Sequence, residues 1–201
     1  MSSTPLDRLS AGLSPRARYS GELTQAAVLV VLDELSSPLS VVLTRRADHL
    51  RLHAGEAAFP GGKCDPGDSS HWDTAAREAH EEVGLPESHL RRLGQLDAVV
   101  TRTGIEVVPC IAELTEPAAM VPNPEELAAV YEVPLDYFAS PAHLYFDERD
   151  YGGVSRRVPR YEWQEHSIWG ITAAILVRLV NITYDAGLPL PHYWQGKAEP
   201  S

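Results

Sequence analysis

"GGKCDPGDSSHWDTAAREAHEEVGL", residues 61–85, is the stretch that decides the fold, because it joins a glycine-rich loop to a short helix dense in carboxylates. Ser70, followed three residues later by Asp73, predicts a helix that begins near residue 71, since such a pair can satisfy the free N–H groups of a first helical turn. Gly84 predicts where the helix ends, because glycine readily adopts the left-handed conformation found just past a helix.

The predicted helix has an apolar stripe and an acidic side. At about 100° per residue, four side chains fall on a stripe that we expect to face the core: Trp72, Ala76, Ala79 and Val83. On nearly the opposite side, which we expect to be exposed, lie Glu78, Glu81 and Glu82. Like charges three and four residues apart on a helix repel each other by about 0.2–0.5 kcal/mol per pair. This acidic trio therefore indicates a bound cation.

The loop before the helix supplies further oxygen atoms. Gly61 and Gly62 permit a close approach of the backbone, which leaves the carbonyl of Gly62 available as a ligand. Three carboxylates and a carbonyl form an all-oxygen site, and such sites select Mg²⁺, Mn²⁺ or Ca²⁺ rather than zinc. The simpler alternative is a solvated acidic face, but ordinary surface helices alternate charge signs, whereas here only Arg77 accompanies the carboxylates.

The rest of the chain outlines an α+β domain in which helices cover a mixed β-sheet. Apolar runs joined by turn residues predict three hairpins, over residues 24–47, 94–114 and 144–163. Apolar residues at helical spacing predict a helix over 168–182 that packs on the sheet. The chain of 201 residues fits a single domain over 21–193, with an irregular or short helical lead-in over 1–20 and a tail over 194–201.

Composition restricts the partners. A formal net charge of −11 disfavours nucleic acid and anionic membranes, because both are polyanions that attract basic surfaces. The longest apolar run, residues 26–32, is far shorter than the roughly 20 residues of a membrane span. The start of the chain lacks the apolar core of a secretory signal, so we expect a cytoplasmic protein.

The acidic helix and its loop resemble the signature of the Nudix hydrolases, G-x5-E-x7-R-E-U-x-E-E-x-G-U, in which U is apolar. Gly62 begins the match, and residues 77–85 complete it at every specified position. The one departure is Asp68, which replaces the first glutamate and is separated from Arg77 by eight residues instead of seven. In the family that early carboxylate has a supporting role, so the departure concerns the loop geometry and not the metal site.

A second motif lies just upstream. "LTRRADHLRLHAGEAAFPGG", residues 43–62, resembles the element L-T-x-R-[SA]-x3-R-x3-G-x3-F-P-G-G of the coenzyme A pyrophosphatase branch. Ten residues are in register: Leu43, Thr44, Arg46, Ala47, Arg51, Gly55, Phe59, Pro60, Gly61 and Gly62. Members of this branch also carry the aspartate form of the signature, with its one-residue-longer spacing.

The resemblance implies a Nudix-type α/β/α sandwich and a site that holds Mg²⁺ or Mn²⁺. The implied metal ligands are Glu78, Glu81, Glu82 and the Gly62 carbonyl, and the implied catalytic residues are Glu81, Arg77 and Glu125. Arg77 is expected to orient a helix glutamate. Glu125, in the loop "NPEE", is our candidate for a base or an extra ligand, with a plain surface glutamate as the alternative. The expected substrate-binding residues are Arg46, Arg51, Gly61 and Lys63, where arginine forks suit phosphate oxygens.

The activity implied by the resemblance is hydrolysis of the diphosphate bond of coenzyme A or its derivatives, which gives 3′,5′-ADP and 4′-phosphopantetheine or its acylated form. Two alternatives stay open: a Nudix pyrophosphatase for ADP-ribose or NADH-type dinucleotides, and a nucleotide-binding regulatory module without catalysis. The expected partner is therefore a small-molecule substrate, with no nucleic acid and no membrane, and a homodimer stays open.

Overall fold

The computed structural model describes residues 4–15, 20–35, 37–191 and 193. Its centre is a mixed sheet of eight strands in which β3, β2, β1, β7 and β5 are successive neighbours. Three further strands extend this path, since β4 pairs with β1, β6 with β7, and β8 with β2. The strands are β1 Thr24–Asp33, β2 Ser40–Arg46, β3 Ala57–Ala58, β4 Gly61–Lys63, β5 Leu90–Gln95, β6 Val99–Val100, β7 Ile105–Leu114 and β8 Leu127–Pro134.

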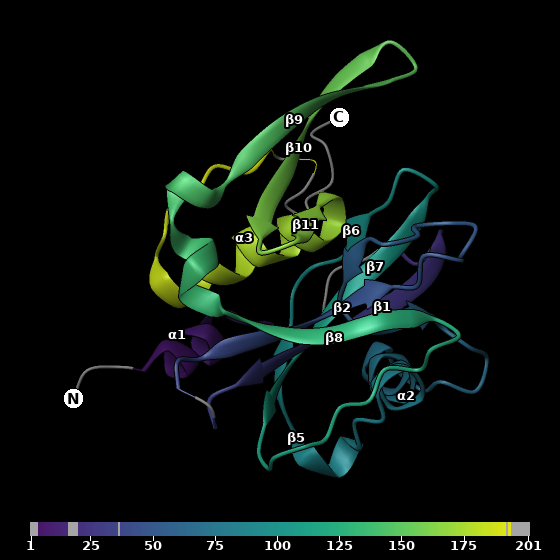
Figure 1. The fold of residues 1–201 in the computed structure, drawn as a ribbon, viewed down its shortest axis with the longest axis vertical. Coiled ribbons are helices and arrows are strands. Elements are labelled where there is room, and N and C mark those ends of the chain that lie inside the picture. Colours follow the sequence, from purple (N-terminus) through teal and green to yellow (C-terminus); the bar gives the residue numbers. More distant parts are fainter. Residues whose placement is uncertain (1–3, 16–19, 36, 192, 194–201) are drawn as a thin grey trace.

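Helices and a smaller sheet surround the central sheet (Figure 1). The α-helices are α1 Pro5–Gly12, α2 His71–Val83 and α3 Gly170–Tyr184, and the short 3-10 helices are η1 Glu87–His89, η2 Leu135–Ala139 and η3 Pro141–His143. The smaller sheet has the order β11-β10-β9, formed by β9 Tyr145–Tyr151, β10 Val154–Trp163 and β11 His166–Trp169. Its β9–β10 hairpin projects beyond α3, away from the central sheet (Figure 1).

Strand β1 shows why the fold has three layers. Its side chains alternate between the two faces of the sheet, as in any strand, and both faces are buried. Leu29 and Val31 belong to the apolar cluster that includes α2, whereas Val30 and Leu32 belong to the cluster that includes α3. This arrangement confirms the predicted α/β/α sandwich.

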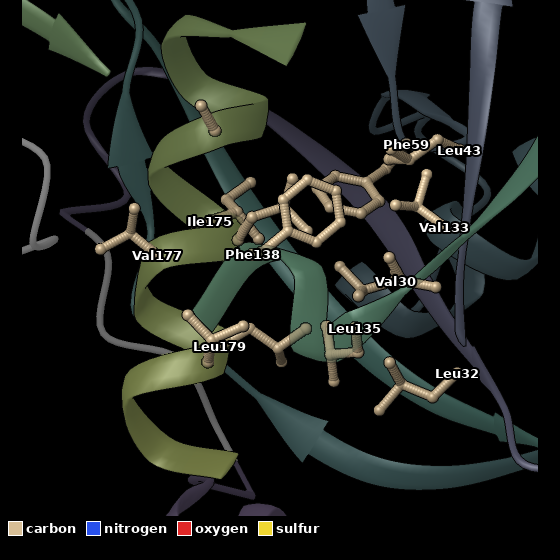
Figure 2. Packing of buried hydrophobic residues seen from close by; sticks show 14 of the residues in the cluster. Val30, Leu32, Leu43, Phe59, Val133, Leu135, Phe138, Ile175, Val177 and Leu179 are labelled. Carbon is tan, nitrogen blue, oxygen red and sulfur yellow. The ribbon is translucent and has the colours of Figure 1, made fainter. Parts of the chain in front are cut away.

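The larger apolar cluster fills the space between the sheet and α3. Figure 2 shows Ile175 of α3, Phe138 of η2 and Val30 of β1 converging there. Phe138 meets the ring of Tyr161 edge to face, with the ring centroids 5.0 Å apart. Full burial of such a side chain contributes about 1.5–3 kcal/mol, so this layer anchors α3 and the smaller sheet.

The predicted hairpins and the last helix are confirmed, with small shifts at their ends. β1 pairs antiparallel with β2, β6 with β7, and β9 with β10. The helix predicted over 168–182 begins at Gly170, because the residues before it form β11. In the expected lead-in, residues 5–12 form α1, and Leu6 and Leu9 are buried in the core. The domain boundaries themselves stay predictions, and the tail over 194–201 lies outside the described residues. Across the described residues, every helix is too short or too polar to cross a bilayer.

Candidate active site

Helix α2 has the ends that the sequence predicts. The hydroxyl of Ser70 accepts a hydrogen bond from the backbone N–H of Asp73, at 3.2 Å. Gly84 ends the helix in the left-handed conformation, with φ of 70°. The apolar stripe, which includes Trp72 and Ala79, is buried against the sheet. The helix is therefore fixed in rotation, and this determines where its carboxylates point.

Glu82 is buried, and the prediction that it lies on an exposed face is wrong. Its side chain and backbone together are only 4% exposed. The N–H of Gly61 donates a hydrogen bond to Glu82 Oε2 at 3.0 Å, and the N–H of Asn123 donates to the Glu82 carbonyl at 2.7 Å. Burial raises the pKa of the Glu82 carboxyl to about 7, against the opposing effect of the Gly61 hydrogen bond. Two chain segments far away in sequence thus cover this side of α2.

Glu78 lies directly against the backbone of Gly62. A Cβ atom added at Gly62 would lie 2.4 Å from Glu78 Oε1, so a larger residue would displace the carboxylate. Burial raises the pKa of the Glu78 carboxyl, although the neighbouring Arg77 opposes that rise. The glycine is therefore needed for space, and its backbone lies beside the carboxylate as the sequence predicts.

Arg77 connects the helix carboxylates to the loop. Its Nη1 atom lies 2.9 Å from Glu78 Oε1 and 3.3 Å from Glu81 Oε2. The side chain of Glu81 is 57% exposed. Its Nη2 atom donates to the backbone carbonyl of Lys63 at 3.3 Å. Arg77 therefore positions Glu78 and leaves Glu81 open to solvent.

Asp68, the residue that departs from the signature, is the anchor of Arg77. Nε and Nη2 of Arg77 donate to its two carboxylate oxygens, and Thr74 Oγ1 and the N–H of Asp65 donate to Oδ2 at 2.8 and 2.9 Å. The Arg77 guanidinium and these donors hold the pKa of the Asp68 carboxyl far below its usual range. The structure thus gives this aspartate the supporting position that the resemblance implies.

Glu126, rather than the predicted Glu125, is the loop carboxylate whose charge acts on the helix carboxylates. Both glutamates are exposed, but Glu126 is among the charges that raise the pKa of both Glu78 and Glu82, and Glu125 is not. The Glu126 carbonyl accepts from the N–H of Ala47 at 2.9 Å, immediately before β8 pairs with β2. The "NPEE" loop contains both glutamates, and Glu126 lies where β8 begins to pair with β2.

Arg46, at the end of β2, reaches the same region. It lowers the pKa of the Glu82 carboxyl, and it lines a pocket of about 440 Å³. Its Nε atom is buried and has no hydrogen-bond partner. A buried guanidinium N–H without a partner is costly, so Arg46 is prepared to bind an anion.

The other expected substrate-binding residues are more scattered. Arg51 is exposed in the loop between β2 and β3, and it does not line the pocket that Arg46 lines. Lys63 is exposed at the end of β4. Gly61 has a φ of 156°, and a Cβ there would lie 2.4 Å from the carbonyl oxygen of Ala27. Gly61 is thus required for β4 to pair closely with β1.

The donors in this region fit a hard divalent cation. Within the described residues, no three acidic, histidine or cysteine side chains converge as a complete metal site, so a cation would have to draw the carboxylates together. Glu78 and Glu82 are nevertheless both largely desolvated and repel each other and Glu126. A divalent cation would offset that repulsion, and carboxylate oxygens are the ligands that Mg²⁺ and Mn²⁺ prefer.

Comparisons with known proteins show the family of this chain. The sequence model of the NUDIX domain matches residues 23–151. A protein of Yersinia enterocolitica described as "Uncharacterized Nudix hydrolase NudL" is 42% identical over 163 residues, which are 81% of this chain and 83% of that protein. A protein of the same description from Photorhabdus laumondii is 39% identical over 83% of this chain and 89% of its own.

A solved structure supports the fold. The MutT/nudix family protein of Enterococcus faecalis superposes with a TM-score of 0.50 over 85% of this chain and 65% of its own, at 16% identity. The predicted fold and family are therefore confirmed, while the coenzyme A branch stays a prediction. The matched domain and the extent of identity together place this chain in the Nudix hydrolase family.

Proposed function

We propose that this Nudix hydrolase cleaves the diphosphate bond of coenzyme A and its derivatives, with Mg²⁺ or Mn²⁺, and releases 3′,5′-ADP and a 4′-phosphopantetheine product. The observation that carries the proposal is the position of Arg46. This arginine belongs to the motif that resembles the coenzyme A branch, and its unpaired Nε is buried in a pocket wall close to the buried Glu82. The branch motif and the general Nudix signature therefore meet in one place.

Each residue of the site has a separate role in the proposed hydrolysis. Glu78, Glu82 and Glu126, with the carbonyl of Gly62, would hold the cation, which supplies Lewis acidity and lowers the pKa of a water molecule when it is bound. Arg77 positions Glu78 through the bond at 2.9 Å. Arg46 balances negative charge on the diphosphate. Glu81, which is exposed beside Arg77, would accept a proton from the attacking water.

The nearest alternative is a Nudix pyrophosphatase for ADP-ribose or a dinucleotide such as NADH. Those substrates share the diphosphate but lack both the pantetheine arm and the 3′-phosphate. Nine of the ten residues in register with the coenzyme A motif lie outside the general Nudix signature, and these nine favour coenzyme A.

One set of rate measurements separates the alternatives. We would compare kcat/KM for coenzyme A, dephospho-coenzyme A and ADP-ribose with Mg²⁺ present, and identify the products by chromatography. Preference for coenzyme A with release of 3′,5′-ADP is the expected result. Faster turnover of ADP-ribose than of coenzyme A would overturn the proposed substrate.

A further inference from the structure

The pocket that Arg46 lines is unusually rich in arginine for a protein of net charge −11. Three arginines from separate segments line it: Arg46 of β2, Arg102 of the turn between β6 and β7, and Arg149 of β9. Two aromatic side chains, Tyr151 and Trp169, complete the same wall. Segments that are far apart in sequence thus bring positive charge to one cavity.

Two of these arginines are held by aromatic rings. The guanidinium carbon of Arg149 lies 4.4 Å from the centroid of the Trp169 ring, and that of Arg102 lies 5.7 Å from the Tyr151 ring. Such cation–π contacts restrain a guanidinium by its face and leave the N–H groups at its edge free to bind oxygen atoms. Nη2 of Arg149 lies 4.0 Å from Oδ2 of Asp147, which is at the limit of an ion pair.

Glu56 also lines the pocket, where its Oε2 atom is 2.8 Å from His53 Nδ1. Its single negative charge offsets only one of the three arginines. The first residues of α3, from Gly170 to Thr172, also line the pocket, and Trp169 gives the helix no side-chain cap. The N-terminus of a 15-residue helix adds a partial positive charge there. The pocket is therefore suited to an anion.

Arg102 and Arg149 are distinct from the groups that face the scissile bond. Glu78 and Glu82 belong to α2, which lies on the other side of β8 from the β9–β10 hairpin in Figure 1. Arg46 is the residue shared by both regions, since it influences Glu82 and also lines the pocket. A substrate whose diphosphate reaches Arg46 would place its adjoining part among Arg102, Arg149 and Trp169.

We infer that this pocket binds a phosphate monoester that the substrate carries in addition to its diphosphate, and that Arg102 and Arg149 are the residues that select for it. The inference rests on the proposed function, because coenzyme A carries such a group on its ribose. The guanidinium groups of Arg102 and Arg149, each in contact with an aromatic ring, suit a phosphate dianion, because its several oxygens can accept from their paired N–H donors. The pocket would then distinguish nucleotides that differ only in that phosphate.

Calorimetric titration tests the inference without turnover. The probes are 3′,5′-ADP and AMP, which differ by the one phosphate and contain no diphosphate bond to hydrolyse, with Mg²⁺ present throughout. We expect the wild-type protein to bind 3′,5′-ADP at least about tenfold more tightly than AMP, since charge-assisted hydrogen bonds are strong. In the double variant Arg102→Ala/Arg149→Ala this ratio should fall close to one, while the affinity for AMP stays the same.

Two further variants provide the controls. Arg91→Ala on β5 removes one positive charge, as Arg102→Ala or Arg149→Ala alone does, at an exposed residue paired with Glu113, and it should keep the full ratio. Arg149→Lys should recover part of the preference for 3′,5′-ADP over AMP that Arg149→Ala loses, because lysine restores the charge but not the paired N–H donors of a guanidinium. Circular dichroism and thermal unfolding establish that each variant is folded.

The two proposals fail in different ways. A ratio of one in the wild-type protein, or a ratio that survives in the double variant, would overturn the phosphate pocket even if coenzyme A is hydrolysed. If the wild-type protein prefers 3′,5′-ADP to AMP and the double variant does not, the phosphate pocket is supported even if coenzyme A is not hydrolysed. In that case only the proposed reaction fails.

Discussion

The guanidinium of Arg77 binds both oxygens of the Asp68 carboxylate, with Nε 3.2 Å from Oδ1 and Nη2 3.1 Å from Oδ2. The same guanidinium donates from Nη1 to Glu78. Asp68 therefore acts on Glu78 through Arg77, and it does so despite being a shorter residue than the glutamate of the general signature.

Asp68→Asn is expected to lower activity by about 10–100-fold, which is typical when the group that orients a catalytic or ligating residue is lost. The amide can accept from Arg77 with only one oxygen and no longer carries charge. Asp65→Asn is the matched control, because its carboxylate is 3.8 Å from Arg77 Nη2 and 68% exposed. Steady-state rates with coenzyme A measure both, and equal losses in the two variants would contradict this role.

Gly62→Ala is expected to weaken Mg²⁺ binding by at least about tenfold, because the new methyl group would collide with the Glu78 carboxylate. Gly67→Ala is the control in the same loop, since a Cβ at that position meets no atom within 4 Å. Titration of each variant with Mg²⁺ or Mn²⁺ gives the affinities. A Gly62→Ala protein that binds the cation as well as Gly67→Ala does would show that Glu78 is not a ligand.

Neighbouring glutamates test the loop before β8. Glu126→Gln should lower kcat by about 10–100-fold, because Glu126 is the loop carboxylate that acts on both Glu78 and Glu82. Glu125→Gln should stay near the wild-type rate. The opposite order would restore Glu125 as the base or ligand that the sequence alone suggested.

Adjacent arginines on β2 test the role of Arg46. Arg46→Ala should raise KM for coenzyme A by about tenfold or more with a smaller fall in kcat, since its buried Nε is expected to bind a phosphate oxygen. Arg45→Ala removes the same charge from a residue whose guanidinium is 2.5 Å from Asp48, and its KM should change little. If both variants show the same kinetics, Arg46 contributes only net charge.

Glu82 makes the metal-free protein sensitive to pH. Burial raises the pKa of its carboxyl from 4.5 to about 7, so between these values the unfolded chain loses a proton that the folded protein keeps. Stability in EDTA is therefore expected to fall as pH rises through this window, and the loss is complete above about pH 7. The wild-type protein should lose about 1–3 kcal/mol of its free energy of unfolding between pH 4 and pH 8 through Glu82, and Glu82→Gln should not show this loss. Urea unfolding at the two pH values measures it.

The same substitution should abolish turnover at every pH, because a cation can bind only the ionised carboxylate. In the wild-type protein, affinity for Mg²⁺ should accordingly increase as pH rises toward 7. Glu116→Gln removes an exposed carboxylate and serves as the control for both measurements. Near wild-type activity of Glu82→Gln with Mg²⁺ present would contradict the assigned site.

Local patterns predicted the elements that depend on neighbouring residues. Ser70 and Gly84 marked both ends of α2, and the apolar runs gave the hairpins, because caps and turns are decided within a few residues. The burial of Glu82 was not predictable in this way, since the groups that cover it come from Gly61 and from the segment around Asn123. The position of Glu126 likewise depends on the pairing of β8 with β2, which no local pattern specifies.

At the middle of the central sheet, β1 and β7 are parallel partners whose paired residues are 81 positions apart. Contacts between such distant residues form late, because the chain must close a large loop before they stabilise it. Both α2 and β4 lie inside that loop, whereas the segment around Asn123 that covers Glu82 follows β7 in the chain. A nascent chain that ends before Ile105 lacks the partner strand, and one that ends before Asn123 still lacks the cover of Glu82, so the site can be completed only after synthesis has passed both.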